Sequence, residues 1–132
     1  MIVVDSSVLV AIAREETDHH RFAALIARAG ACIGSPTVVE TKLVLASVLS
    51  PAASDDMFDR LARDAGLKPV AFTPEMADAA VQAFRRFGKG QGHPAQLNFG
   101  DCLAYAVAKV LDAPLLYKGN DFAQTDIRPA LP

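Results

Sequence analysis

The chain has 132 residues, a formal net charge of −2 at pH 7 and a hydrophobic content of 52%. This length is typical of one compact domain, so we predict a single domain over residues 1–132. No apolar run approaches the ~20 residues of a membrane span, and Met1–Asp5 lacks the basic segment of a signal peptide, so we expect no membrane association. The negative charge argues against a broadly basic nucleic-acid surface. The two cysteines, Cys32 and Cys102, are far apart and indicate buried free thiols in a reducing cytoplasm.

Apolar periodicity and helix-start residues divide the chain into alternating strands and helices. We predict four strands, over residues 2–5, 31–33, 69–72 and 115–117. The first strand is followed by a helix to about residue 14 and a helix from Asp18 to Gly30, and the second by a helix capped by Ser35 to about residue 49 and a helix capped by Ser54 to Gly66. The third strand is followed by a helix from Thr73 to Gly88, a loop over 89–97 and a helix capped by Asn98 to about residue 112. Such alternation indicates an α/β fold with a short, mostly parallel central sheet flanked by helices.

Four acidic residues stand where such a fold would bring them together. Ligands of parallel sheets bind beyond the carboxyl ends of the strands. Asp5 ends the first predicted strand, and Asp121 follows the last one after a short turn. Glu40 and Asp101 lie near the starts of helices that could point toward the same rim. We therefore predict that the four carboxylates converge at one edge of the sheet.

Each of these acids also has a purely structural explanation. The explanations are a helix cap for Asp5, a capping box with Thr37 for Glu40, a favourable helix dipole for Asp101, and a Gly-Asn-Asp turn for Asp121. The Ser35–Pro36 start weakens the explanation for Glu40, because it places this residue near the fifth helical position, beyond a capping box. Apolar neighbours surround Glu40, and Asp5 ends an apolar strand, so both charges need compensation. Clustered carboxylates without histidine or thiolate favour Mg²⁺ or Mn²⁺.

Four motifs in this order resemble those of PIN domains, in the form typical of bacterial VapC toxins. The motifs are Val3–Ser7, Ser35–Glu40, Leu97–Ala106 and Leu115–Phe122, the last followed by Thr125–Asp126. Each motif alone is weak, but together they span essentially the whole chain. The resemblance implies a PIN fold and a ribonuclease that is the toxin of a toxin–antitoxin pair. It also implies inhibition by a cognate VapB-like antitoxin, and usually a homodimer.

The resemblance further implies roles for particular residues. The acidic metal site would comprise Asp5, Glu40, Asp101 and Asp121. Ser6 and Thr125 would hydrogen-bond the scissile phosphate or metal-bound waters, and Asp126 would be an extra or outer ligand, with Asp121 and Asp126 as alternatives for the closer approach to the metal. We therefore predict that one or two Mg²⁺ or Mn²⁺ ions activate water to hydrolyse RNA phosphodiesters. The cations would also offset the negative charge of the chain locally.

Two further features leave alternatives open. Arg85, Arg86 and Lys89, with Lys118, form either a local basic track for RNA or a solvated helix end. The high apolar content reflects either a tightly packed interior or a face that another chain covers. The rival functions are a phosphohydrolase that forms a phospho-aspartate, and a catalytically inactive or receiver-like acidic module that acts through a protein partner. The phosphohydrolase expects a second acid two residues after the first, where Ser7 stands. A receiver domain expects adjacent acids after the first strand, and Ser6–Ser7 replaces them.

Overall fold

The structure is a computed structural model that describes residues 1–131. Four parallel strands form one sheet in the order β3-β2-β1-β4. The strands are β1 (Ile2–Val4), β2 (Ala31–Gly34), β3 (Leu67–Val70) and β4 (Leu115–Leu116). The chain winds outward from β1 to β3 and then returns to the other side of β1, so the winding direction changes between β1 and β4. This switch point is where α/β sheets place their ligands, and the α/β prediction is confirmed.

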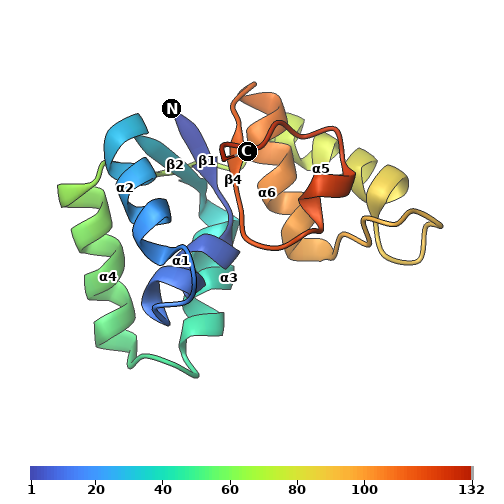
Figure 1. The fold of residues 1–132 in the computed structure, drawn as a ribbon. Coiled ribbons are helices and arrows are strands. Elements are labelled where there is room, and N and C mark those ends of the chain that lie inside the picture. Colours follow the sequence, from blue (N-terminus) through green and yellow to red (C-terminus); the bar gives the residue numbers. More distant parts are fainter. Residues whose placement is uncertain (132) are drawn as a thin grey trace.

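Helices cover both faces of this sheet (Figure 1). The first half of the chain supplies α1 (Ser6–Ala13), α2 (His19–Ala29), α3 (Ser35–Leu45) and α4 (Pro51–Asp64). The second half supplies α5 (Pro74–Phe87), α6 (Phe99–Val110) and the short 3-10 helix η1 (Phe122–Gln124). Figure 1 shows α1, α2 and α4 on one side of β1 and β4, and α5 with α6 on the other.

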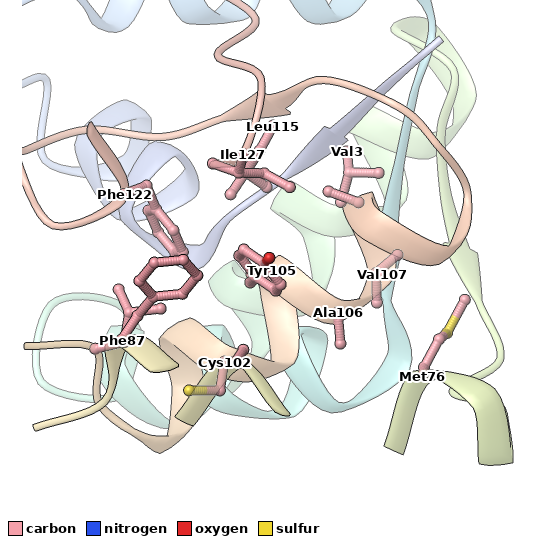
Figure 2. Close-up of a cluster of buried hydrophobic side chains, with 14 of the residues drawn as sticks. Val3, Met76, Phe87, Cys102, Tyr105, Ala106, Val107, Leu115, Phe122 and Ile127 are labelled. Atoms are coloured by element: carbon pink, nitrogen blue, oxygen red, sulfur yellow. The ribbon is translucent and has the colours of Figure 1, made fainter. Parts of the chain in front are cut away.

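Successive residues of β1, β2 and β4 bury their side chains on opposite faces, which explains why these three strands are buried along their whole length. Val3, Cys32 and Leu115 belong to the core shared with α5 and α6. Figure 2 shows Val3 and Leu115 beside side chains of α6. Their neighbours Val4 and Leu116 belong instead to the core shared with α1, α2 and α4. Many of the apolar residues therefore fill two cores, one on each face of the sheet.

Several predicted helix ends are confirmed and others shift. Thr73 caps α5, Asn98 caps α6, and Gly30 ends α2. The prediction that Ser54 caps α4 is wrong. Ser50 caps this helix by accepting the N–H of Ala53 at 3.1 Å, and Pro51 follows it in the first turn. A serine followed by proline is thus the stronger helix start.

Two other predicted caps do not form. Gly34, not Ser35, is the N-cap of α3, and the Ser35 hydroxyl donates to the carbonyl of Val70 at 2.9 Å. Asp18 precedes α2 in a left-handed conformation with φ 74° and makes no side-chain capping bond. The Asp18 side chain therefore leaves the backbone N–H groups in the first turn of α2 uncapped.

The segment after η1 runs beside the edge strand β4. The N–H of Leu115 donates to Arg128 at 2.9 Å, and the N–H of Ala130 donates to Leu115 at 2.9 Å. This segment therefore borders β4 at Leu115, the first residue of the strand. Across residues 1–131, no helix has the length and apolar character needed to cross a membrane.

Candidate functional site

Asp5 lies directly after β1 and is buried. Its Oδ2 accepts the N–H of Ser7 at 3.1 Å, so the side chain caps α1 as one structural explanation predicted. Its Oδ1 is buried and has no hydrogen-bond partner. Burial raises the pKa of Asp5 to about 6; the bonds from Ser7 oppose this shift, and the charges of Asp101 and Glu40 reinforce it. Capping therefore satisfies only part of this carboxylate.

Glu40 lies in the second turn of α3 and does not form a capping box with Thr37. The Oε1 of Glu40 and the hydroxyl of Thr37 are both buried without a hydrogen-bond partner. The carboxylate lies against Gly100 of α6, where an added Cβ would collide with it. This role of Gly100 is not among the sequence-based predictions. Its signal was a glycine inside the first turn of a helix, which costs about 1 kcal/mol relative to alanine.

Asp101 lies in the first turn of α6, where it forms a reciprocal capping box with Asn98. Asn98 Oδ1 accepts the N–H of Asp101 at 2.8 Å, and Asp101 Oδ2 accepts the N–H of Asn98 at 3.0 Å. Burial raises the pKa of Asp101 to about 6, the bond from Asn98 opposes this shift, and the charges of Asp121 and Glu40 reinforce it. Asp101 is therefore both a helix cap and a member of an acidic group.

Asp121 is exposed just before η1 and makes no side-chain capping bond there. Its charge acts on Asp101, while the charges of Asp101 and Glu40 act on Asp5. The four predicted acids thus surround one region beyond β1 and β4. The turn explanation for Asp121 does not account for this proximity.

The chemistry of these residues suits a divalent cation. Their oxygens are the ligands that Mg²⁺ and Mn²⁺ prefer. Asp5 Oδ1 and Glu40 Oε1 are the buried, unpartnered oxygens that such an ion would satisfy, so the donor set fits. Among residues 1–131, no three Asp, Glu, His or Cys side chains are already arranged to hold one metal ion. One Asp101 oxygen remains bonded to Asn98.

The structure gives Asp126 different partners from the four acids. Tyr105 donates its hydroxyl to Asp126 Oδ1 at 2.5 Å, and Lys109 Nζ donates to Oδ2 at 3.0 Å. Arg86 lies 3.5 Å from the same Oδ2. Burial would raise the pKa of Asp126, but these hydrogen bonds and positive charges lower it below its ordinary value. We therefore place Asp126 in an ion-pair cluster and Asp121 in the acidic group.

Smaller polar residues connect the acidic group to the chain around it. Ser7 Oγ accepts the N–H of Lys118 at 3.0 Å, which ties the segment after β4 to the residue that contacts Asp5. Ser6 is half-buried at the start of α1. Thr125 donates its hydroxyl to Phe122 at 2.7 Å within its own turn. The predicted contacts of Ser6 and Thr125 with a phosphate stay predictions.

The basic track is only partly available. Lys118 Nζ pairs with Glu16 at 3.1 Å, and Arg86 pairs with Asp126. Arg85 and Lys89 are exposed at the end of α5 and just after it. The basic residues near the acids are therefore held by acidic neighbours in the free protein.

Comparison with known proteins identifies the fold and family. Residues 2–128 match the PIN domain family. A ribonuclease VapC36 of Mycobacterium tuberculosis is 43% identical over 128 residues, which cover 96% of this chain and 91% of that protein. The chain therefore belongs to the PIN-domain family and, within it, to the VapC ribonucleases.

Solved structures support the same fold. The crystal structure of Mycobacterium tuberculosis VapC20, a toxin that cleaves the sarcin-ricin loop, matches with a TM-score of 0.77 and 15% identity and covers 100% of both chains. VapBC2 from Rickettsia felis, bound to a promoter DNA fragment, matches with a TM-score of 0.74 and 15% identity and covers 98% of this chain and 96% of that chain. The receiver-like and phospho-aspartate alternatives are set aside, because the chain belongs to a ribonuclease family.

Proposed function

We propose that the chain is the endoribonuclease toxin of a toxin–antitoxin pair and that its activity depends on Mg²⁺ or Mn²⁺ at Asp5, Glu40, Asp101 and Asp121. The observation that carries this proposal is the pair of buried, unpartnered oxygens of Asp5 and Glu40 within a group of like charges. Like charges at a buried edge are unfavourable unless a positive group joins them. The alternative of an inactive binding module leaves this arrangement without a purpose.

The residues divide the work by their position. Asp5 offers a buried oxygen from the residue after β1, and Glu40 offers one from α3. Asp101 and Asp121 approach from α6 and from the segment after β4. Together these carboxylates would hold the ion and orient the RNA phosphate beside it. When bound, Mg²⁺ or Mn²⁺ would lower the pKa of a water molecule and neutralise charge on the phosphate. Lys118 would contribute a positive charge close to the acids once RNA competes with Glu16.

The test compares RNA cleavage by the wild type with cleavage by Asp5→Asn and Asp101→Asn. Cleavage should require added Mg²⁺ or Mn²⁺, stop with a chelator, and fall at least ~100-fold in both variants. Asp112→Asn is the matched control, because Asp112 is exposed at the far end of α6. Undiminished cleavage by folded Asp5→Asn and Asp101→Asn would reject the proposal. Binding of RNA without cleavage in any metal would favour the inactive module.

We also propose a VapB-like antitoxin as partner, because VapBC2 of Rickettsia felis shares this fold and its structure contains a toxin with its antitoxin. A short antitoxin-like reading frame next to this gene, and co-purification of its product with this chain, would support the proposal. We further propose a cytoplasmic location, because Cys32 and Cys102 are buried free thiols.

Finally, we propose a homodimer through one apolar face. Nine large hydrophobic residues are exposed among residues 1–131, and six of them lie on α3, α5 and α6: Val39, Leu43, Val44, Val81, Phe84 and Phe99. An apolar groove of ≈580 Å³ runs across this face beside Glu40. Exposed apolar residues gathered in this way indicate a protein contact, and self-association through one face is the commonest symmetric arrangement.

A further inference from the structure

A separate cleft of ≈580 Å³ lies between α2, the segment after β4 and the C-terminal segment. None of the four acids lines it. Its apolar wall includes the buried side chains of Phe22, Leu115 and Ile127. Figure 2 shows Ile127 beside Leu115. The volume lies within the range of small-molecule and nucleotide sites.

The mouth of this cleft carries an aromatic ring and two cations. Tyr117 is half-buried, and its ring centroid lies 5.2 Å from that of Phe122, which supports it. Arg21 and Lys118 supply the positive charges. A planar ring beside cations matches a nucleotide, whose base stacks on the ring while its phosphate meets the cations.

Both cations have acidic partners in the free protein. Arg21 lies 3.4 Å from Asp18, and both side chains are largely exposed. Exposed pairs of this kind are weak and are screened by salt. Lys118 pairs with Glu16 at 3.1 Å. A phosphate can therefore replace the partner of Arg21 at little cost, and the charge of Asp18 opposes phosphate binding.

The cleft is connected to the acidic group by two hydrogen bonds. The N–H of Lys118 donates to Ser7 Oγ at 3.0 Å, and the N–H of Ser7 donates to Asp5 Oδ2 at 3.1 Å. Gly119 also lines the cleft, and the same loop leads on to Asp121. An RNA strand bound across the acids would meet this loop and reach the cleft.

We propose that the cleft binds a nucleotide of single-stranded RNA next to the cleaved bond, with its base on Tyr117 and its phosphate between Arg21 and Lys118. This inference rests on the proposed ribonuclease function. It assigns substrate recognition to residues outside the acidic group. An antitoxin segment and a free mononucleotide are the rival occupants, and the experiment separates them.

The test measures binding of a short fluorescein-labelled single-stranded RNA by fluorescence anisotropy at low salt. All variants carry Asp101→Asn, so that the RNA stays intact. Tyr117→Leu should weaken binding by about 5- to 100-fold, because it removes a stacking surface. Arg21→Gln should weaken binding about 3- to 10-fold, and Asp18→Asn should tighten it. Asparagine tolerates the left-handed backbone at position 18, so this variant keeps the local fold.

Arg28→Gln is the matched control, because it removes the same charge from the exposed end of α2, outside the cleft. It should change the affinity less than Arg21→Gln does. The opposite effects of Arg21→Gln and Asp18→Asn distinguish a binding role from a structural one, and thermal melting confirms that each variant is folded.

Three outcomes overturn the inference. RNA affinity that is unchanged in Tyr117→Leu and Arg21→Gln rejects the cleft. Loss of antitoxin binding with RNA affinity retained would make it a protein-docking site. Binding of AMP that depends on Tyr117, with RNA affinity that does not, would make it a site for free nucleotides. Metal-dependent cleavage by the wild type is measured separately: intact cleavage with any of these results rejects the cleft alone, whereas absent cleavage rejects the proposed function.

Discussion

Gly100 allows the carboxylate of Glu40 to lie against the first turn of α6. No other residue type fits this position without moving the acid, since an added Cβ would overlap the carboxylate. The position is unfavourable for helix formation, because alanine is preferred over glycine by about 1 kcal/mol. Glycine at position 100 therefore lowers the local stability of α6 and allows α6 to approach Glu40 of α3 closely.

Gly100→Ala should displace Glu40 and lower RNA cleavage at least ~10-fold. The colliding atoms are the far end of the flexible Glu40 side chain, which can move at little cost, so thermal melting should show a change in stability of less than about 1 kcal/mol. Cleavage assays measure the loss of activity. A double-mutant cycle with Glu40→Ala identifies the cause, because Gly100→Ala should lower cleavage no further when the carboxylate is absent. An equal fold-loss of cleavage in both backgrounds would show that the collision lies elsewhere.

Asp5 is the other residue whose burial is unfavourable for folding. Asparagine can still accept the N–H of Ser7 as a helix cap, but it carries no charge. Asp5→Asn should therefore raise the stability of the metal-free protein by about 1–2 kcal/mol while abolishing cleavage.

Thermal melting with and without Mg²⁺ tests this prediction. Mg²⁺ should raise the Tm of the wild type, because it binds only the folded state, and should raise the Tm of Asp5→Asn much less. A lower Tm of Asp5→Asn in the absence of metal would mean that the buried charge already has a favourable partner.

At the level of elements, the sequence predicted the order of strands and helices, and its errors have physical causes. Helix α4 begins at Ser50–Pro51 rather than at Ser54, because proline favours the first turn. Ser35 follows the same pattern but bonds to Val70 of β3. A contact between residues far apart in the chain decides that case, and no local pattern reveals it.

In the functional site, too, local sequence patterns predict some positions, and contacts between distant residues decide others. Asp5 and Asp121 were predictable from strand ends, because parallel strands bring their carboxyl ends to one edge. The partners of Asp126 were not, since Tyr105 and Lys109 come from the middle and last turns of α6. Motif proximity placed Asp126 next to Asp121, whereas side-chain contacts place it in another cluster.

This Asp126 cluster attaches the segment after η1 to α5 and α6. The pKa of Asp126 is lowered in the folded state, because the two hydrogen bonds and the charges of Lys109 and Arg86 outweigh the effect of burial. Its stabilising contribution is therefore fully present above the ordinary pKa of 3.8 and is lost as the pH falls through the lowered value.

Asp126→Asn should thus lower the Tm at neutral pH and lose less stability than the wild type on acidification to about pH 3. Melting curves across this range measure the difference. Asp112→Asn serves as the control, because the Asp112 side chain is 95% exposed and its ion pair with Arg128, at 3.8 Å, is weak. Parallel curves for the wild type and Asp126→Asn would show that the cluster makes no pH-dependent contribution.

At the scale of the whole molecule, the strand order joins the acidic group to the molecular surface. The change of winding direction between β1 and β4 leaves an edge where α3 and α6 both begin near the strand ends. Glu40, Phe99 and Gly100 line the apolar groove on the face proposed for the homodimer. A second copy bound there would therefore lie next to the acids, so the proposed association would limit substrate access to them.

Leu43→Glu should prevent the proposed homodimer from forming. Leu43 is 71% exposed on this face, and a carboxylate buried in an apolar interface is strongly unfavourable. Sedimentation at micromolar concentration measures the mass of each species. Leu111→Glu is the matched control, because Leu111 is 40% exposed at the other end of α6 and should leave the dimer intact. A wild type that sediments as a monomer, or a Leu43→Glu variant that stays dimeric, would remove this face as the interface. The apolar groove beside Glu40 would then be open to RNA or the antitoxin.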